Sequence, residues 1–299
     1  MITQKSCHTV LVVATTPRKE NLQVDLEGIQ KNVHFLIENG VDFIMPQCGT
    51  GLVYDSTLSE FETVVGAFQD AANGKAVIVP GIGPGYGRSL EMGKIAKSLH
   101  VDGVMIMPIV GPASDRGTYN GLKHISQSVG LPIILYQRRL DIMPAHFVAK
   151  LCELDEVVGL KYAVSDFNAF DKIRDLAGQH AAMTCGLAED PCIDFMNHGA
   201  VGFSSGMANF VPKMSLNIHK QYFAGNKKEA QRLRDLMVPF EDFRAEGNGR
   251  YSAAALHTAL EYANLAGGPV IPFVEDVAEK DIPRVHQMMD VLLKEENQL

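Results

Sequence analysis

The sequence has few cysteines and no long apolar run. Its five cysteines are odd in number and include no Cys-x-x-Cys pair, which predicts reduced thiols rather than a disulfide framework. No apolar run approaches the roughly 20 residues that a membrane-spanning helix needs. The run Val10–Ala14 is too short for a signal peptide and lacks a basic flank with a cleavage site. We therefore expect a cytoplasmic protein with no membrane partner.

Basic charge and metal-binding patterns are also scarce. Asp and Glu outnumber Lys and Arg by 35 to 27, and the net charge of −8 argues against a nucleic-acid partner. The histidines form no His-x-His or His-x-x-x-His pair, so no metal site is predicted. The stretch Gly81–Gly87 lacks the third glycine of a dinucleotide-binding loop, and Pro84 removes an N–H that a phosphate would need. We predict no cofactor.

Eight short apolar runs alternate with longer amphipathic segments. The runs are rich in Val, Ile and Met, as is typical of parallel strands buried on both faces. Strands that alternate with helices of about 10 to 15 residues indicate βαβ units. Eight such units predict a closed (β/α)8 TIM barrel of the α/β class, with a doubly wound open sheet as the alternative. The expected strands are Thr9–Ala14, Val41–Pro46, Ala76–Gly81, Gly103–Pro108, Pro132–Tyr136, Val157–Ala163, Ala181–Gly186 and Ala200–Ser205, and the expected helices between them are Leu26–Glu38, Leu90–Leu99, Phe147–Leu154 and Phe167–Leu176.

Beyond Ser205 the pattern predicts helices alone. Only the first of them is needed for the eighth βα unit, so the others predict a C-terminal helical subdomain. Gly225–Asn226 interrupts the pattern, which places the barrel at residues 1–224 and the subdomain at residues 225–299. The acidic stretch Phe240–Glu246 is expected to be a solvated helix face. The expected helices are Val211–Phe223, Lys227–Glu246, Ser252–Ala266 and Ile282–Glu295.

Lys161 is the most informative candidate residue, because active sites of (β/α)8 enzymes lie at the carboxyl ends of the strands. It lies within the apolar run Val157–Val164. Burial disfavours the ammonium form and so favours the free amine, which can attack a carbonyl carbon and form a Schiff base. The alternative is a lysine that reaches solvent or pairs with a carboxylate.

Further candidates follow other strands. Tyr136 ends the strand before that of Lys161, where its phenol could move protons to and from an imine. Gly49-Thr50-Gly51 is a permissive turn whose N–H groups and hydroxyl could hold a carboxylate. Arg138 lies two residues beyond Tyr136, a spacing that repeats the facing on a strand, and suits a carboxylate contact. Each also has a purely structural interpretation: a core tyrosine, a plain βα turn and a surface arginine. Two more candidates for substrate binding at strand ends are Gly186 and Ser204.

These residues resemble the motifs of the dihydrodipicolinate synthase / N-acetylneuraminate lyase superfamily of class I aldolases, over about Thr9 to Ala266. The anchors are Gly49-Thr50-Gly51, Tyr136 and Gly159-Leu160-Lys161. The resemblance implies that Lys161 forms an imine with a 2-keto acid, that Tyr136 relays protons, and that the loop at Thr50 binds the keto-acid carboxylate. It also implies a homo-oligomer, a tetramer or a dimer.

Within the superfamily the chain is most similar to 5-keto-4-deoxyglucarate dehydratases, whose Tyr-Asn-Arg pattern matches Tyr136-Gln137-Arg138. Three positions depart from the superfamily. Leu52 replaces a usual glutamate, Val110 replaces the tyrosine of the synthases' proton relay, and Asp141 replaces their substrate-binding arginine. The synthase reaction is therefore not expected.

The sequence thus predicts a Schiff-base-forming lyase that acts on a 2-keto acid. The expected reaction is dehydration of a keto-deoxy sugar acid, with or without decarboxylation. Arg138 and Ser204 are expected to contact the far end of the substrate. Two alternatives stay open: a retro-aldolase that releases pyruvate, and a barrel that binds a keto acid without turnover.

Overall fold

All eight predicted strands are present, most of them shortened by one or two residues at their ends. The third is divided in two at Val79–Pro80, since Pro80 has no N–H to donate to a ladder. The computed structural model describes all 299 residues. The strands are β1 (Val10–Val13), β2 (Phe43–Met45), β3 (Val77–Ile78), β4 (Gly81–Ile82), β5 (Val104–Ile106), β6 (Ile133–Gln137), β7 (Val157–Tyr162), β8 (Ala182–Cys185) and β9 (Gly202–Ser205).

The strands form one parallel sheet in the order β3-β2-β1-β9-β8-β7-β6-β5-β4. The two end strands are the halves of the divided strand, so the sheet closes on itself. Val79 N–H donates to the carbonyl of Ile44 over 3.0 Å, and Met105 N–H donates to that of Pro80 over 2.9 Å, which carries the ladder across the gap. The predicted (β/α)8 barrel is confirmed, and the open-sheet alternative is wrong.

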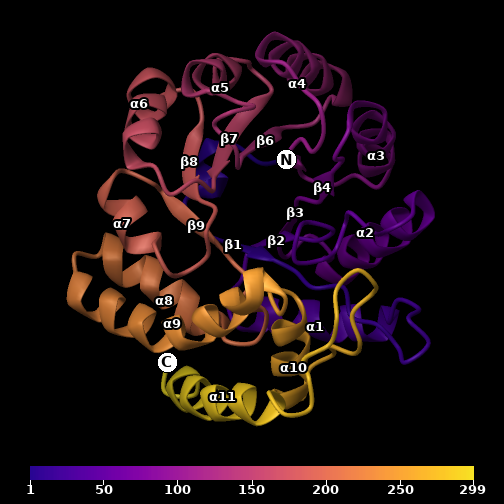
Figure 1. Ribbon diagram of the computed structural model, residues 1–299, viewed down its shortest axis with the longest axis vertical. Coiled ribbons are helices and arrows are strands. Elements are labelled where there is room, and N and C mark those ends of the chain that lie inside the picture. The colour runs from indigo at the N-terminus through magenta and orange to yellow at the C-terminus, as the bar shows by residue number, and fades with distance from the viewer.

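Helices surround the barrel, as Figure 1 shows, and the predicted ones lie within a few residues of their expected bounds. Three more, α2, α4 and α7, lie in segments for which no range was predicted. None of the helices is both long and apolar enough to cross a membrane. The helices are α1 (Leu26–Glu38), α2 (Leu58–Ala72), α3 (Tyr86–Ser98), α4 (Asp115–Val129), α5 (Ala145–Cys152), α6 (Phe167–Ala177), α7 (Cys192–Asn197), α8 (Pro212–Phe223), α9 (Lys227–Gly249), α10 (Ala254–Tyr262) and α11 (Ile282–Glu296), with short 3₁₀ helices η1 (Gln4–Cys7) and η2 (Met207–Asn209).

Side-chain caps fix where several barrel helices begin. Thr57 accepts a hydrogen bond from the N–H of Glu60 over 3.1 Å at the start of α2. Asp166 accepts one from Ala169 over 2.9 Å at the start of α6. Each cap satisfies an N–H that has no partner within its helix. These local signals set the length of the loop between each strand and the helix that follows it.

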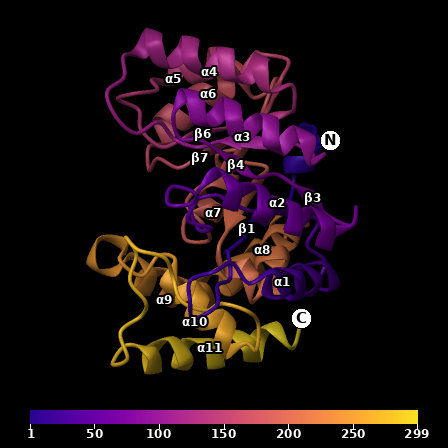
Figure 2. The ribbon, with the colours of Figure 1, turned by 90° about the vertical axis from the view of Figure 1, so that its right-hand side faces the viewer.

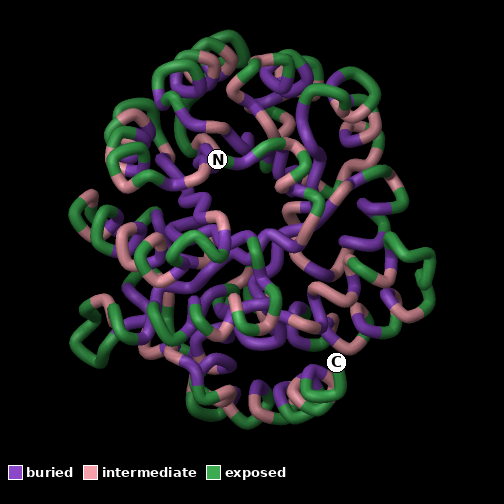
Figure 3. Tube along the Cα trace, turned by 180° about the vertical axis from the view of Figure 1, so that it is seen from behind, coloured by how far each residue is buried: buried purple, intermediate pink, exposed green.

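Side chains along each strand point alternately toward the surrounding helices and into the barrel. Figure 3 shows the strands buried, whereas the outer turns of the helices are exposed. On β7, Tyr162 packs against Phe170 of α6 with ring centroids 5.2 Å apart. Because neighbouring residues of a strand face opposite sides, Lys161 faces the barrel interior. The apolar β7 thus carries one charged side chain inward.

The last three helices form a layer across one side of the barrel (Figure 2). The carboxylate of Glu296, near the end of α11, accepts hydrogen bonds from the N–H groups of Lys213 and Met214 over 2.9 and 2.8 Å. These are free N–H groups in the first turn of α8. The layer is therefore fastened to the barrel by a carboxylate at a helix N-terminus. The subdomain boundary at residue 225 stays a prediction.

Gly202 lets β9 approach the first strand closely. A Cβ there would lie 2.2 Å from the carbonyl oxygen of Thr9 and 2.7 Å from that of Cys7. Both contacts are with backbone atoms, so no side-chain rotation relieves them.

We predict that Gly202→Ala lowers the free energy of unfolding by about 1–3 kcal/mol or more, seen as a lower urea midpoint by circular dichroism. Gly121→Ala in α4, where no atom lies within 4 Å, is the control and should leave the midpoint unchanged or slightly raised. Equal midpoints for the two variants would contradict this prediction.

Candidate active site

The barrel places Lys161 beside Tyr136. The register of β6 and β7 pairs these two residues directly, and the Nζ of Lys161 lies 4.0 Å from the centre of the Tyr136 ring. Lys161 is only 5% exposed, and the structure contains no carboxylate in salt-bridge contact with it. The lysine therefore neither reaches solvent freely nor pairs with an acid, which are the two structural alternatives to a reactive amine.

The groups around the Lys161 amine are kept uncharged. Burial raises the pKa of the Cys48 thiol to about 12 and that of Cys185 to about 12, although the charge of Lys161 opposes both shifts. Both thiols therefore stay protonated at neutral pH. Gly186 leaves room for the lysine, because a Cβ at this position would lie 2.9 Å from the Cγ of Lys161. A larger residue at position 186 would displace the lysine stem.

The turn Gly49-Thr50-Gly51 follows β2 and offers unused hydrogen-bond donors. The N–H groups of Thr50 and Gly51 donate to no group of the protein, and neither does the Thr50 hydroxyl. Leu52, with φ of 56°, closes the turn through its N–H to the carbonyl of Gly49 over 3.1 Å. Adjacent free N–H groups form a concave site that suits an anion such as a carboxylate.

A network of buried polar side chains holds this turn. Thr16 donates to the carbonyl of Gly51 over 3.2 Å, and Ser56 donates to the side-chain oxygen of Gln47 over 2.9 Å. Arg88 donates to the carbonyls of Val53 and Ser56 over 2.6 and 2.9 Å. The free donors of the turn are therefore held in position before any ligand arrives.

Arg138 and Tyr54 lie at the mouth of the site. Arg138 follows the end of β6 and is exposed, yet it lines the same cavity as Tyr136. Burial raises the pKa of the Tyr54 phenol to about 12, with Tyr136 adding to the rise and Arg138 opposing it. Tyr54 was not among the predicted site residues, although it lies only three residues beyond the Gly49–Gly51 turn.

One cavity of about 320 Å³ brings these parts together at the carboxyl ends of the strands. Seven of the eight predicted site residues line it, and Gly51 lies behind the turn, where a Cβ would lie 3.1 Å from the carbonyl oxygen of Ala14. The seven are Gly49, Thr50, Tyr136, Arg138, Lys161, Gly186 and Ser204.

Two charged residues in the cavity come from a helix face that the sequence predicts to be solvated. Glu241 and Arg244 of α9 line it, and Glu241 is only 7% exposed. The prediction that Phe240–Glu246 is a solvated face is therefore wrong for these two positions. The two side chains lie on one face of the helix because they are three residues apart, and that face borders the cavity.

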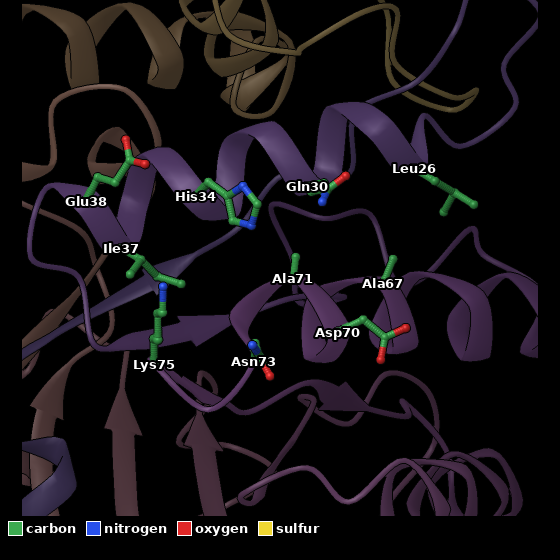
Figure 4. Close-up of a pocket in the computed structure, with 10 residues that line it drawn as sticks. All are labelled: Leu26, Gln30, His34, Ile37, Glu38, Ala67, Asp70, Ala71, Asn73 and Lys75. Atoms are coloured by element: carbon green, nitrogen blue, oxygen red, sulfur yellow. The ribbon is translucent and has the colours of Figure 1, made fainter.

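A larger hollow lies outside the barrel, between α1 and α2. It has a volume of about 650 Å³ and is shown in Figure 4, where the side chains of His34, Glu38, Asp70 and Lys75 lie around it. All four are on the outer faces of the two helices or just beyond α2, and none makes an ion pair within the protein. This groove is remote from the strand ends and contains no buried reactive group.

The profile of the Dihydrodipicolinate synthetase family matches residues 6–291. The chain belongs to this family. It is 23% identical over 278 residues to a probable 5-dehydro-4-deoxyglucarate dehydratase of Bacillus licheniformis, with 90% of each chain covered. It is 29% identical over 236 residues to a 4-hydroxy-tetrahydrodipicolinate synthase of Pelagibacter ubique, covering 76% of this chain and 80% of that one. The crystal structure of dihydrodipicolinate synthase from Oceanobacillus iheyensis superposes with a TM-score of 0.91 at 29% identity, covering 99% of this chain and 98% of that one.

Membership of the dihydrodipicolinate synthetase family confirms the prediction of an enzyme of the class I lyase type. The three departures from the superfamily pattern lie outside the cavity. Leu52 is buried behind the turn, and Val110 is 67% exposed in the loop after β5. Asp141 forms an exposed ion pair with Arg139 over 2.5 Å. Val110 instead lines an adjoining hollow of about 510 Å³, which shares Tyr54, Tyr136 and Arg138 with the cavity.

A buried acid lies behind the cavity. Glu189 is fully buried and accepts hydrogen bonds from the hydroxyls of Ser205 and Ser215, while its second oxygen has no partner. Burial, with a smaller contribution from the charge of Glu241, raises the pKa of Glu189 to about 8. The side chain is therefore mainly a neutral carboxylic acid at pH 7.

This pKa makes stability depend on pH. Between its ordinary value of 4.5 and about 8, the folded protein holds a proton on Glu189 that the unfolded chain has lost. The free energy of unfolding must then fall as pH rises through this window. We predict that Glu189→Gln flattens the decline of the urea midpoint between about pH 5 and about pH 9. Glu62→Gln, at an exposed position of α2, should keep the wild-type slope. Equal slopes for wild type and Glu189→Gln would show that Glu189 ionises normally.

Proposed function

We propose that this enzyme is a Schiff-base-forming lyase that dehydrates a keto-deoxy sugar acid, a 2-keto acid, with or without decarboxylation. The observation that carries the proposal is the amine of Lys161, which is buried without an acidic partner 4.0 Å from the centre of the Tyr136 ring. An unpaired amine next to a phenol in a cavity at the strand ends suits nucleophilic attack on a carbonyl followed by proton transfer.

The first step forms the imine. The Nζ of Lys161 attacks the C2 carbonyl carbon of the substrate to form a carbinolamine. The carbinolamine loses its oxygen as hydroxide, which takes a proton from the Tyr136 phenol and leaves as water. The products are an iminium ion on Lys161 and a phenolate on Tyr136, so one water has been released and charge is conserved.

The second step uses the iminium ion as an electron sink. The Tyr136 phenolate removes a proton from C3, and the electrons of the C–H bond form an enamine. The enamine then expels the hydroxyl at C4, which takes the proton back from Tyr136 and leaves as water. The new double bond joins C3 and C4, and hydrolysis of the imine restores both Lys161 and Tyr136.

The remaining residues bind the substrate. In this proposal the free N–H groups of the Gly49-Thr50-Gly51 turn and the Thr50 hydroxyl hold the C1 carboxylate. Arg138 and Ser204 contact the distal hydroxyl groups, and Gly186 leaves space for the lysine. The imine itself activates the substrate, so none of these steps calls on a cofactor.

Dehydration is favoured over the synthase reaction by the relatives and by the loop after β5. The relatives include a protein named as a probable 5-dehydro-4-deoxyglucarate dehydratase that covers 90% of this chain. Val110, at the position of the synthase tyrosine, carries no hydroxyl and does not line the cavity. A phenol relay through that position is therefore absent from the proposed mechanism.

The imine is tested by borohydride trapping with pyruvate and with a 5-keto-4-deoxy sugar diacid. We expect a reduced adduct on Lys161, measured by intact mass and located by peptide mapping. Lys161→Met, which keeps an unbranched side chain of nearly the same length without its amine, should give no adduct. The absence of any adduct in the folded wild-type enzyme would refute the imine mechanism.

The proton relay is tested by Tyr136→Phe, which removes the hydroxyl and keeps the ring against Lys161. We expect kcat to fall by roughly 10²- to 10⁴-fold, the usual contribution of a positioned acid or base, measured as release of dehydrated product. Trapping of pyruvate on Lys161 should persist, although more slowly. Tyr119→Phe, on the outer helix α4, is the matched control and should keep wild-type kcat. An unchanged kcat in Tyr136→Phe would assign the proton transfers to another group.

A further inference from the structure

An arginine from the C-terminal helical layer enters the cavity of Lys161. Arg244 lies on α9, and its side chain is only 12% exposed. It lines the cavity with Lys161, Ser204 and Gly206. A cation enclosed this far from solvent is costly unless anionic or carbonyl groups surround it. The groups that the protein supplies leave part of the guanidinium free.

The guanidinium is held in position from two sides. Its Nη1 donates to Glu241 Oε1 over 2.5 Å, and its Nε donates to the carbonyl oxygen of Ser252 over 2.9 Å. Nη2 donates to no group of the protein. Ser252 reaches Arg244 because the helix breaks at Glu246–Asn248, where Gly247 and Asn248 have φ of 59° and 64°. The break turns the chain back along the helix and aligns the arginine before a ligand binds.

Gly206 provides the space that the guanidinium occupies. A Cβ at Gly206 would lie 3.2 Å from both Nη1 and Nη2 of Arg244 and 3.1 Å from Leu256 Cδ1. The backbone at Gly206 has φ of −89° and ψ of −36°, a conformation open to any residue. A Cβ at this position would therefore press on the guanidinium, whereas the backbone conformation itself does not call for glycine.

We propose that Arg244 is a specificity-determining residue that binds a second carboxylate, at the end of the substrate away from the imine. The inference rests on the proposed function, in which the Gly49-Thr50-Gly51 turn holds the first carboxylate. Arg244 lines the cavity with Nη2 unused by the protein, and the planar donors of a guanidinium match the geometry of a carboxylate. The substrate class is thus a 2-keto acid with a carboxylate at each end.

The charges next to Arg244 are compatible with binding an anion. Glu241 uses one donor of the guanidinium. Glu189, whose pKa is affected by both Glu241 and Arg244, is mainly neutral at pH 7 because of its burial. Glu189 therefore adds little negative charge that would repel a second carboxylate. Asp190, which also interacts with Glu241 and Arg244, has its pKa raised to about 6 chiefly by burial.

The test compares two keto acids with the same carbon chain. 2-Oxoadipate carries a carboxylate at each end, and 2-oxohexanoate carries only the one beside the ketone. For each keto acid, the concentration that gives half-maximal borohydride trapping on Lys161 is measured by intact mass. We expect the wild-type enzyme to trap the diacid at about ten- to hundredfold lower concentration, as expected for one charged hydrogen-bonded pair in a closed site.

The variants remove the arginine without leaving its partner charged. Arg244→Gln combined with Glu241→Gln neutralises both groups, and we expect it to abolish the preference, so that 2-oxoadipate and 2-oxohexanoate reach half-saturation at similar concentrations. Gly206→Ala leaves every charge in place and should weaken the same preference by displacing the guanidinium. Arg232→Gln, which removes an arginine on α9 that pairs with Glu229 and Glu295, is the control and should keep the preference.

Adipate provides a readout that does not depend on the imine, because it has two carboxylates and no ketone. Its binding by calorimetry should be lost in the double variant and retained in Arg232→Gln. A wild-type enzyme that traps both keto acids equally, or a double variant that loses both to the same extent, would overturn the role of Arg244. If the folded wild type traps neither keto acid, the imine proposal fails. The role of Arg244 is then judged by adipate alone, and equal binding of adipate by wild type and double variant would refute it.

Discussion

The pairing of β6 with β7 places Tyr136 beside Lys161, and the rest of the cavity is organised around that register. A slip of one residue would turn Lys161 toward the outer helices, because the facing of side chains reverses at every residue of a strand. Tyr162 opposes such a slip from the other face by packing against Phe170. The position of the amine is therefore set by apolar packing on the side of the sheet away from the chemistry.

An amine buried in this way constrains its neighbours. The thiols of Cys48 and Cys185 have pKa values of about 12 and remain neutral, and position 186 must be a glycine to leave room for the lysine stem. No acid pairs with Lys161, so its amine is enclosed without a carboxylate partner.

The cavity is assembled from parts of the chain that are far apart in sequence. The turn after β2 supplies free N–H donors, β6 and β7 supply the phenol and the amine, and α9 supplies Glu241 and Arg244. In our proposals the barrel performs the reaction common to the family, whereas the C-terminal helices select the substrate. This division follows from the fold, since the strand ends are fixed by the sheet and the layer above them is free to differ.

Local pattern was sufficient for most of the barrel. The eight apolar runs predicted the strands because strands buried on both faces need continuous apolar sequence, and the bounds Leu26–Glu38 of α1 were correct. The division of the third strand at Val79–Pro80 was missed, because a proline within an apolar run does not reveal which neighbour each half pairs with. The helix α9 was predicted, but its burial was not, since Glu241 and Arg244 have the composition of a solvent-exposed face.

The sequence by itself determined the repeat of strands and helices, the lysine within an apolar strand, and the tyrosine at the end of the strand before it. These are local facts of spacing and polarity, and they were enough to predict the barrel and to single out two side chains that the barrel places next to each other. Only the tertiary structure decided that the amine has no acidic partner, that Glu189 is enclosed, and that Arg244 lies in the same cavity as Lys161. Those outcomes depend on which groups the closed barrel and the neighbouring helix α9 bring together, because burial and contact between distant residues arise only when the chain is packed.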